Sequence, residues 1–490
     1  MRFNYLLSAV GLILVYIGFV MLVPIAVALI FKEYTEILSF LLPALVVVLT
    51  GFLLKFTSNK IAPVENFNDI KKSEALFIVV LVWVLFGIVS AVPMTLAGLS
   101  PVNALFETVS GITTTGATIL VNFDYSHTFF FWRAFLQWLG GMGVIVLFIA
   151  ILPQFAVAGR QMFFAEAPGP TEDKLTPRIR NTASALWAIY ALLTLMQIIF
   201  LIIAGMNPFD AICNAFATLA AGGFSPNAQS TMGYNSNLIT FIMMIFIFIA
   251  GVSFNVQYVA LSKLKPWEIF KSEEVRAYTG IFLILGAVIA ISLYLNHDYG
   301  SIKETLLHAY YQVISIMTTT GSSSADYTEW NFTAQLLLGL AFFTGGCAGS
   351  GSGGIKITRL CLVFKVMKIE LQKILHPNAV VNIKMDNIIV PKDVISQVIV
   401  FVMFYFLVIL ISSLIISIVE QNLLIGFTSA VSLIGNVGPA YPAVVGPMGS
   451  FDSLHNISKL ILIFNMYVGR LELIPFLVML QGDFWSFKRS

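Results

Sequence analysis

The chain has 490 residues, of which 58% are hydrophobic and 11% are charged, and its formal net charge at pH 7 is +2. With a mean hydropathy of +0.90, this composition excludes a water-soluble globular protein and indicates an integral membrane protein surrounded by lipid. The small net charge gives no reason to expect a nucleic-acid partner. No nucleophile–base pair or phosphate-binding loop signature appears, so we expect no enzyme activity. The three scattered cysteines lack metal-ligand spacing and are expected to be small core residues.

Apolar runs near the ~20 residues that span a bilayer occur at ten places. They centre near residues 18, 46, 86, 142, 195, 250, 286, 340, 407 and 467. The first, from about Tyr5 to Phe31, is too long for a signal-peptide core and is expected to remain as an anchor. With the N-terminus in the cytoplasm, the outer side keeps only four basic residues, Lys32, Arg133, Lys303 and Lys459. This asymmetry predicts that both termini are cytoplasmic.

Four of the outward connections are long, and each carries an apolar segment too short to span a bilayer, as is typical of re-entrant segments. They are "PVNALFETVSGITTTGATIL", "NPFDAICNAFATLAAGGFSP", "IKETLLHAYYQVISIMTTTGSSS" and "LLIGFTSAVSLIGNVGPAYPA". Each segment breaks at a glycine, and the four glycines are 107, 98 and 117 residues apart: Gly116, Gly223, Gly321 and Gly438. Small residues lie six positions before these glycines: Ser110, Ala217, Ser315 and Ser432.

This pattern predicts four copies of a helix, a re-entrant loop and a helix, preceded by an extra helical pair. The fold class is therefore an all-α polytopic membrane protein with ten transmembrane helices. The expected division is an N-terminal helical pair over residues 1–60 and four pore repeats over 61–180, 181–275, 276–390 and 391–490, the third containing a broken eighth helix.

Non-helical backbone is tolerated at membrane depth only where it is buried in protein or lines a water-filled cavity. Four loops that face one axis would stack their carbonyls in rings, which can replace the hydration shell of a cation. The short helices would direct their partially negative C-terminal ends to the same axis. The predicted cation filter consists of Thr114, Thr115, Gly116, Ala221, Gly222, Gly223, Thr319, Thr320, Gly321, Asn436, Val437 and Gly438.

A single Thr-Thr-Thr-Gly stretch between membrane helices is more often an ordinary loop, and it is the fourfold recurrence that favours a pore. The second copy has no hydroxyl at Ala220 to Gly223, and the fourth, Gly435 to Gly438, also diverges. Selectivity is therefore expected to depend mainly on carbonyls.

The loops "SGITTTGAT", "ATLAAGGFS", "MTTTGSSS" and "IGNVGPA" resemble those of the Trk/Ktr/HKT superfamily of potassium transporters. So do "QWLGGMGVIVL", "FFTGGCAGSGSGGIKITR" and "YVGRLELIPFL", and the extra helical pair is most similar to the bacterial TrkH/TrkG branch. The resemblance covers essentially the whole chain. It implies potassium uptake at the bacterial inner membrane, potassium bound at the filter residues, a homodimer with one pore in each protomer, and a cytosolic TrkA-type nucleotide-binding regulatory subunit. No covalently bound cofactor is expected, and any nucleotide is expected on the regulatory partner.

The eighth predicted helix is interrupted at residues 344–356, where six glycines in thirteen positions cannot hold a regular helix. We expect this segment to cross the pore below the filter and to act as a gate. The alternative is that its glycines only permit close helix packing. The predicted gate residues are Gly345, Gly346, Gly349, Gly351, Gly353, Gly354, Lys356 and Arg470.

Arg470 is the one basic residue that this topology leaves in the middle of a span, and such a charge normally faces a cavity or a partner. Below the filter it would repel potassium and bind the carbonyls of the gate. Glu472 is the alternative partner, although residues two apart on a helix point in different directions. The resemblance also places an arginine at this position. Two roles remain open for Glu107, which lies within the first short helix. It is either a source of negative potential near the outer mouth or a structural carboxylate whose hydrogen bonds are satisfied.

The cytoplasmic connections are too short to fold as domains. "EAPGPTEDKLTPRIRNTAS" and the C-terminal "FWSFKRS" are candidate docking segments for a regulator, and "AVVNIKMDNIIV" predicts a small hairpin around "MDN". The main functional hypothesis is a gated potassium pore. The alternatives are a transporter coupled to sodium or protons and a membrane scaffold or receptor for a nucleotide-binding ring.

Overall fold

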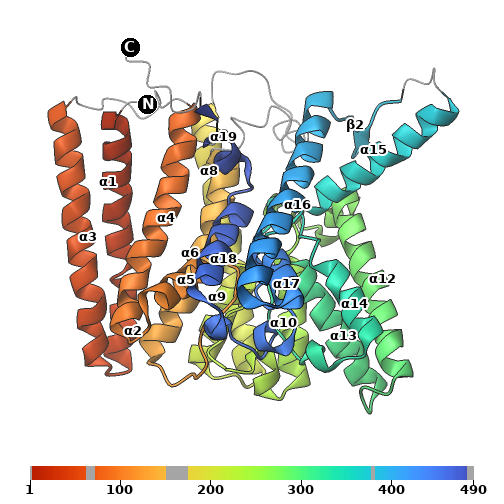
Figure 1. Ribbon diagram of the computed structural model, residues 1–490, viewed down its shortest axis with the longest axis horizontal. Helices are drawn as coiled ribbons and strands as arrows, with labels where there is room; N and C mark the ends of the chain where they lie inside the picture. The colour runs from red at the N-terminus through yellow and green to blue at the C-terminus, as the bar shows by residue number, and fades with distance from the viewer. Residues whose placement is uncertain (1–2, 62–71, 151–174, 377–380, 480, 483–490) are drawn as a thin grey trace.

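The computed structural model describes residues 3–61, 72–150, 175–376, 381–479 and 481–482. The described chain is mostly helical (Figure 1). Its α-helices and strands are α1 (Phe3–Val20), α2 (Val23–Ile30), α3 (Tyr34–Ile61), α4 (Lys72–Leu96), α5 (Pro101–Ile112), α6 (His127–Ala150), α8 (Leu175–Ile203), α9 (Pro208–Leu219), α10 (Asn237–Ala250), α11 (Phe254–Ser262), α12 (Glu273–Leu295), α13 (Ile302–Met317), α14 (Phe332–Ala341), α15 (Ile357–Leu375), β1 (Lys384–Met385), β2 (Ile388–Ile389), α16 (Lys392–Glu420), α17 (Leu423–Ile434), α18 (Asn456–Arg470) and α19 (Ile474–Met479).

Six helical spans among the described residues are long and apolar enough to cross a membrane, so the protein is a multi-pass membrane protein. A seventh is added if α10 and α11, bent by 97°, count as one span. The expected first span is present as one run over Asn4–Ile30 that includes α1 and α2. The apolar helices that the sequence places near residues 340 and 467 are shorter, since α14 has 10 residues and α18 has 15. The total of ten membrane helices therefore stays a prediction.

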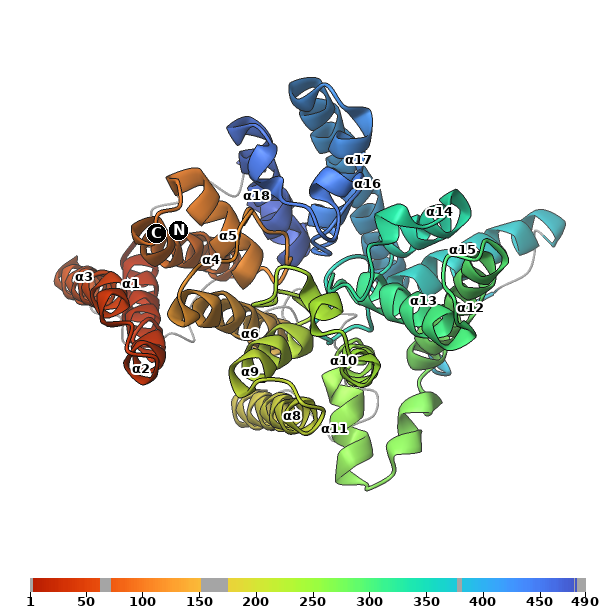
Figure 2. The same ribbon diagram turned by 90° about the horizontal axis from the view of Figure 1, so that it is seen from below.

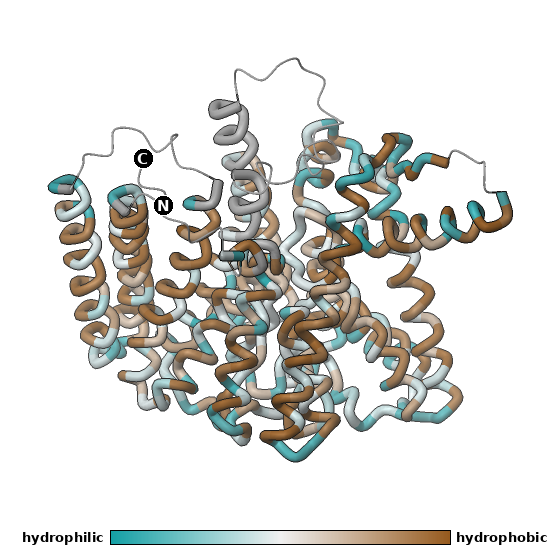
Figure 3. Tube along the Cα trace, turned by 45° about the horizontal axis from the view of Figure 1, so that its top comes forward, coloured by the Kyte–Doolittle hydropathy of each residue, from teal (hydrophilic) through white to brown (hydrophobic). Residues whose placement is uncertain are grey.

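The outward faces of the long helices are apolar, as lipid contact requires. Ile30 and Ile203 are each 75% exposed, and Leu49 is 67% exposed. Figure 3 shows hydrophobic residues along the lengths of the helices and hydrophilic residues mainly at their ends and in the connections. Because water would penalise such an extensive apolar surface, this pattern indicates a surface that lies in the hydrocarbon region of a bilayer.

The N-terminal helices α1 and α3 approach each other closely because glycines meet at their crossing. A Cβ atom on Gly11 would lie 2.7 Å from the Gly51 carbonyl oxygen, and one on Gly51 would lie 2.6 Å from the Gly11 carbonyl oxygen. Without a hydrophobic driving force between helices in lipid, such close backbone contact is a main source of helix association.

Besides apolar packing, a polar contact links this helical pair to the rest of the chain. The Glu33 carboxylate accepts hydrogen bonds from the backbone N–H groups of His127 and Thr128 at the start of α6, at 2.8 and 2.9 Å. Partial burial works against ionisation of Glu33, but the hydrogen bonds from Thr128 and His127 outweigh it and lower the carboxyl pKa. A negative charge at this helix N-terminus also complements the helix dipole.

Substitution Gly51→Val tests the close crossing of α1 and α3. The added side chain has no room beside the Gly11 carbonyl, so we expect a loss of about 1–3 kcal/mol, as for other overpacked sites. The thermal midpoint of the detergent-solubilised protein, followed by size-exclusion chromatography, measures this loss. Gly280→Val is the control because a Cβ at Gly280 meets no atom within 4 Å. Equal midpoints for the two variants would show that the crossing does not depend on Gly51.

Four short helices, α5, α9, α13 and α17, lie around a common centre in the view of Figure 2. They contain 12, 12, 16 and 12 residues, and each ends at a tight turn.

The two short strands form a hairpin. β1 and β2 pair in antiparallel register, Lys384 with Ile389 and Met385 with Ile388. The predicted small hairpin is therefore confirmed. The candidate docking segment "FWSFKRS" lies outside the described residues, as do residues 166–174 of "EAPGPTEDKLTPRIRNTAS".

Candidate functional site

The turn after each short helix is closed by the same backbone hydrogen bond. In each case the N–H group of the residue before the aligned glycine donates to the carbonyl oxygen of the small residue six positions before that glycine. The four bonds are Thr115 to Ser110 at 2.8 Å, Gly222 to Ala217 at 2.8 Å, Thr320 to Ser315 at 2.8 Å and Val437 to Ser432 at 2.9 Å. The four turns therefore share one backbone conformation although their side chains differ.

Two residues in each turn have positive φ. The glycines have φ values of 81°, 75°, 73° and 103° at Gly116, Gly223, Gly321 and Gly438. Two positions earlier, non-glycine residues adopt left-handed φ values of 53°, 55°, 59° and 56° at Thr114, Ala221, Thr319 and Asn436. Left-handed backbone is unfavourable for residues with a Cβ and is found where the surrounding structure enforces it. Sequence reasoning located the glycines but not the second strained position.

In three of the turns a serine hydroxyl donates a hydrogen bond, here called the latch, that holds the turn closed. Ser110, Ser315 and Ser432 donate to the carbonyl oxygen of the residue after the glycine, at 2.6, 2.5 and 2.7 Å. The second turn has Ala217 in this place and uses a side chain from α6 instead. Gln137 donates to the Gly222 carbonyl at 2.7 Å and accepts from the Phe224 N–H at 3.1 Å. The role of Gln137 could not be read from its position in the sequence.

Ser315→Ala removes one hydroxyl latch and leaves the buried Ser322 carbonyl without that donor. We expect a loss of about 1 kcal/mol of stability, the usual net value of such a hydrogen bond. The thermal midpoint in detergent is the measurement, and exposed Ser262→Ala is the control. A midpoint for Ser315→Ala as high as that of the control would contradict a stabilising role for the latch.

The four turns close a ring through contacts between glycines and carbonyl groups. The carbonyl oxygen before each glycine lies against the glycine of a neighbouring turn. The separations between a Cβ built on the glycine and the neighbouring oxygen are 2.1 Å (Gly116 to Gly222), 1.9 Å (Gly223 to Thr320), 2.0 Å (Gly321 to Val437) and 2.5 Å (Gly438 to Thr115). Because a real Cβ cannot approach so closely, any side chain at these positions would displace the adjacent turn.

The ring brings together all twelve residues of the predicted filter. Among the residues that the structure describes, no hydrogen-bond donor reaches the carbonyl oxygens of Thr115, Thr320 or Val437, whereas Gly222 is bound by Gln137. Asn436 makes a second contact between turns, since its amide nitrogen donates to Thr115 Oγ1 and to the Met466 carbonyl, each at 3.0 Å. Such free, closely grouped carbonyls have the chemistry to replace water around a cation.

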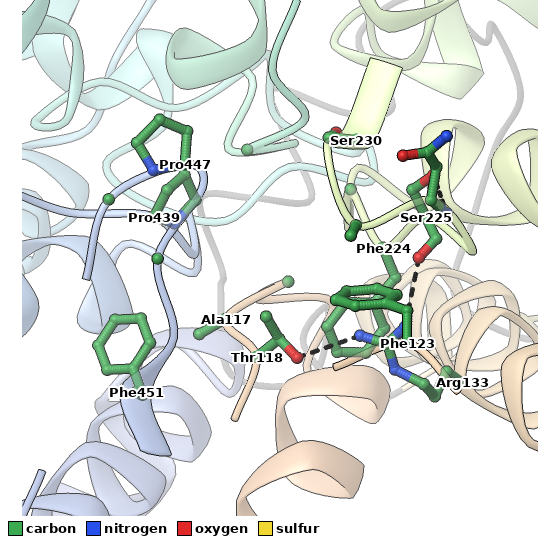
Figure 4. Close-up of a pocket in the computed structure, with 17 residues that line it drawn as sticks. Ala117, Thr118, Phe123, Arg133, Phe224, Ser225, Ser230, Pro439, Pro447 and Phe451 are labelled. Atoms are coloured by element: carbon green, nitrogen blue, oxygen red, sulfur yellow. Dashed lines mark hydrogen bonds between the residues drawn. The ribbon is translucent and has the colours of Figure 1, made fainter. Parts of the chain in front are cut away.

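A pocket of about 60 Å³ adjoins the ring on the side where the chain leaves the glycines. It is lined by Gly116, Gly223 and Gly321 and by side chains such as Phe123 and Arg133 (Figure 4). Arg133 pairs with the fully buried Glu107 at 2.7 Å. The sequence leaves two roles open for Glu107, and the structure shows a carboxylate satisfied by hydrogen bonds.

The glycine-rich segment between α14 and α15 lies against the other end of the turns. Residues 342–356 are not helical, as predicted, and they contain Gly345, Gly346, Gly349, Gly351, Gly353, Gly354 and Lys356. The Gly353 N–H donates to Thr319 Oγ1 at 2.6 Å. A Cβ on Gly353 would lie 2.5 Å from the Gly435 carbonyl oxygen. The segment thus contacts the residues that precede the third and fourth glycines of the ring.

Both ends of this segment are held by hydrogen bonds. The Gly345 N–H donates to the Ile355 carbonyl at 2.8 Å and closes the base of the segment. The half-buried Glu274 carboxylate accepts from the Ala348 N–H at 2.7 Å and from the Thr358 N–H at 3.1 Å. The Lys356 ammonium donates to the Ser352 carbonyl. Glu274 was not identified from the sequence, because its partners lie more than seventy positions away in the chain.

Arg470, the last residue of α18, is only 2% exposed and connects the segment to α6. Its guanidinium donates to the Gly351 carbonyl at 2.8 Å and to the Gly140 carbonyl at 3.2 Å. Glu472 forms an ion pair with Arg359, and no ion pair joins it to Arg470 within the described residues. The structure therefore places Arg470 against a carbonyl of the glycine-rich segment.

These features define a multi-pass helical membrane protein with carbonyl-bearing, non-helical turns buried in its interior, an arrangement typical of membrane transport proteins. A family model described as "TrkH: Cation transport protein" matches residues 46–486. The chain belongs to this family.

Individual relatives are similar over nearly their whole length. The chain is 37% identical to the Trk system potassium uptake protein TrkH of Escherichia coli K12, with 99% of this chain and 100% of the relative covered. It is 31% identical to the Trk system potassium uptake protein TrkG of the same organism, with 95% of each covered. The crystal structure of the potassium transporter TrkH from Vibrio parahaemolyticus matches with a TM-score of 0.89 at 33% identity, covering 99% of this chain and 100% of that chain.

Proposed function

We propose that this protein conducts potassium inward across the bacterial inner membrane through a pore at the centre of the four turns. The observation that carries the proposal is the closed ring of glycines and neighbouring carbonyls at Gly116, Gly223, Gly321 and Gly438. The names of the relatives, which are potassium uptake proteins, support potassium as the ion. In this proposal the chain consists of the N-terminal pair and the four repeats predicted from the sequence, with ten membrane helices and cytoplasmic termini.

Selection in this pore depends on the backbone. Carbonyl oxygens at Thr115, Thr320 and Val437 have no protein donor among the described residues and are available to replace the water around potassium. The four short helices end at the turns, so their partially negative C-termini add attraction for a cation. The membrane potential drives inward flow, with about 2.3 kcal/mol for each charge per 100 mV.

The glycine-rich segment and Arg470 form the gate in this proposal. The segment lies against the inner ends of the turns, and Arg470 holds its Gly351 carbonyl. A positive charge beneath the filter opposes the passage of potassium. Glycines such as Gly349 and Gly354, with φ of 75° and 63°, absorb the backbone changes that opening requires.

Control of the gate is assigned to a partner. We propose a homodimer and a cytosolic TrkA-type subunit that carries the nucleotide, since the relatives are named as parts of a Trk system. The hairpin β1–β2 provides a route to the gate: Asp386 accepts from the Glu273 N–H at 2.6 Å, and Glu274 beside it binds the segment.

Potassium and sodium flux into liposomes at imposed voltages tests the pore. For the unmodified chain we expect potassium flux that follows voltage without a sodium or proton gradient. Gly116→Ser should lower the potassium preference over sodium by about tenfold, because the new Cβ would lie 2.1 Å from the Gly222 carbonyl oxygen and displace the second turn, which distorts the ring of carbonyls around the ion. The control is Gly205→Ser, since Gly205 also has positive φ, 94°, but a Cβ there meets no atom within 4 Å.

The outcomes of this experiment separate the candidate functions. Flux that appears only with a sodium or proton gradient indicates coupled transport. Absence of flux under every gradient indicates a scaffold or receptor. An unchanged ion preference in a conducting Gly116→Ser protein would place the filter elsewhere.

Arg470→Ala tests the gate. Loss of the guanidinium removes both a hydrogen bond to the segment and a positive charge in the ion path, so we expect resting potassium flux without the regulator to rise by about tenfold. Exposed Arg276→Ala is the control. Resting flux that is unchanged or lower in Arg470→Ala, with the protein still folded by size-exclusion chromatography, would assign Arg470 a structural role only.

A further inference from the structure

The Arg133 side chain lies beside the outer end of the ring, a position where a cation would oppose potassium entry. Among the described residues that line the adjoining pocket, Arg133 is the one charged side chain, and it shares the lining with Gly116, Gly223 and Gly321. Figure 4 shows its guanidinium directed toward Thr118 and Ser225, which follow the first and second glycines. A pore for cations therefore carries a positive charge at its entrance, and this charge needs compensation.

Arg133 braces two turns of the ring from this position. Its guanidinium donates to the Ser225 carbonyl and to Thr118 Oγ1, each at 3.3 Å. The guanidinium carbon also lies 4.1 Å from the centre of the Phe224 ring. The first two turns are thus joined through one side chain from α6, and removal of Arg133 would release both.

Glu107 supplies the opposite charge from behind the first turn. Its carboxylate is fully buried and accepts from Arg133 Nε at 2.8 Å. Its second oxygen accepts from the Ile119 N–H at 2.9 Å and from Thr118 Oγ1 at 3.2 Å. Both oxygens are therefore occupied, which argues against direct binding of a passing cation by Glu107.

We propose that Glu107 is a positioning residue that neutralises Arg133, so that the arginine can brace the first and second turns without repelling potassium at the pore entrance. This inference rests on the proposed function. A buried ion pair adds little net stability when compared with apolar packing, but removal of one partner leaves an uncompensated charge in a medium of low dielectric constant.

Two roles for Glu107 are compared: neutralising the Arg133 charge, or supporting the structure only. They predict different rankings of potassium flux among the variants. In Glu107→Gln the Arg133 charge is unpaired, and we expect inward potassium flux to fall by about tenfold or more, most strongly at low external potassium. In Glu107→Gln with Arg133→Gln the charge is gone, so flux should recover above that of Glu107→Gln although more contacts of the brace are lost. A structural role alone predicts that the double variant is at least as impaired.

The experiment measures voltage-driven potassium flux into liposomes for the unmodified chain and the two variants, with exposed Glu329→Gln as the matched control. Size-exclusion profiles and thermal midpoints establish folding. If Glu107→Gln does not fold, Glu107→Asp and Arg133→Gln are compared. The retained charge should then keep the flux of Glu107→Asp within about threefold of the unmodified chain, because the arginine stays neutralised.

The two proposals fail in different ways. An unmodified chain that conducts, with a double variant no better than Glu107→Gln, overturns the neutralising role and leaves the pore intact. Flux of Glu107→Asp that falls more than about threefold has the same meaning, because the charge is conserved. An unmodified chain without potassium flux under any gradient contradicts the proposed function, and the inference falls with it.

Discussion

The contact between a glycine and the carbonyl of a neighbouring turn is the constraint on which the candidate site depends. Each glycine leaves room for a carbonyl oxygen of the neighbouring turn. At Gly321, a Cβ atom would lie only 2.0 Å from the Val437 carbonyl oxygen. The turn that supplies that oxygen is positioned in the same way by the next one. One displaced turn therefore disturbs its neighbours, and the positive φ at Thr319 and its equivalents is maintained by the closed ring.

Because backbone atoms make the ring, the four turns do not need the same side chains. The second turn lacks the serine latch, and Gln137 from α6 holds it instead. The fourth has Asn436 where the first and third have threonine, and its amide connects the ring to α18 through the Met466 carbonyl. Approximate fourfold symmetry of the backbone is thus combined with individual support for each turn, as expected for segments joined in one chain.

Sequence reasoning found the short helices and their glycines because the length of an apolar run and the presence of glycine are local signals. It also found the break in the eighth helix and the buried charge at Arg470. The residues that these groups contact could not be predicted from the sequence. Left-handed φ at Asn436 and the binding of the segment by Glu274 arise from contacts between distant parts of the chain. The described residues include six or seven spans by length and composition, so the ten-helix count remains a prediction.

The ring and the glycine-rich segment share a hydrogen bond, which limits how independently they can move. The Gly353 N–H donates to the Thr319 hydroxyl within the third turn. Asn436 in the fourth turn binds α18 at Met466, one turn before Arg470, which binds the same segment at Gly351. In the proposed function, withdrawal of the segment breaks the bond to Thr319 and exposes its buried hydroxyl to the ion path. Under that proposal, opening of the gate changes the environment of the inner end of the filter, which links ion occupancy to gating through these two turns.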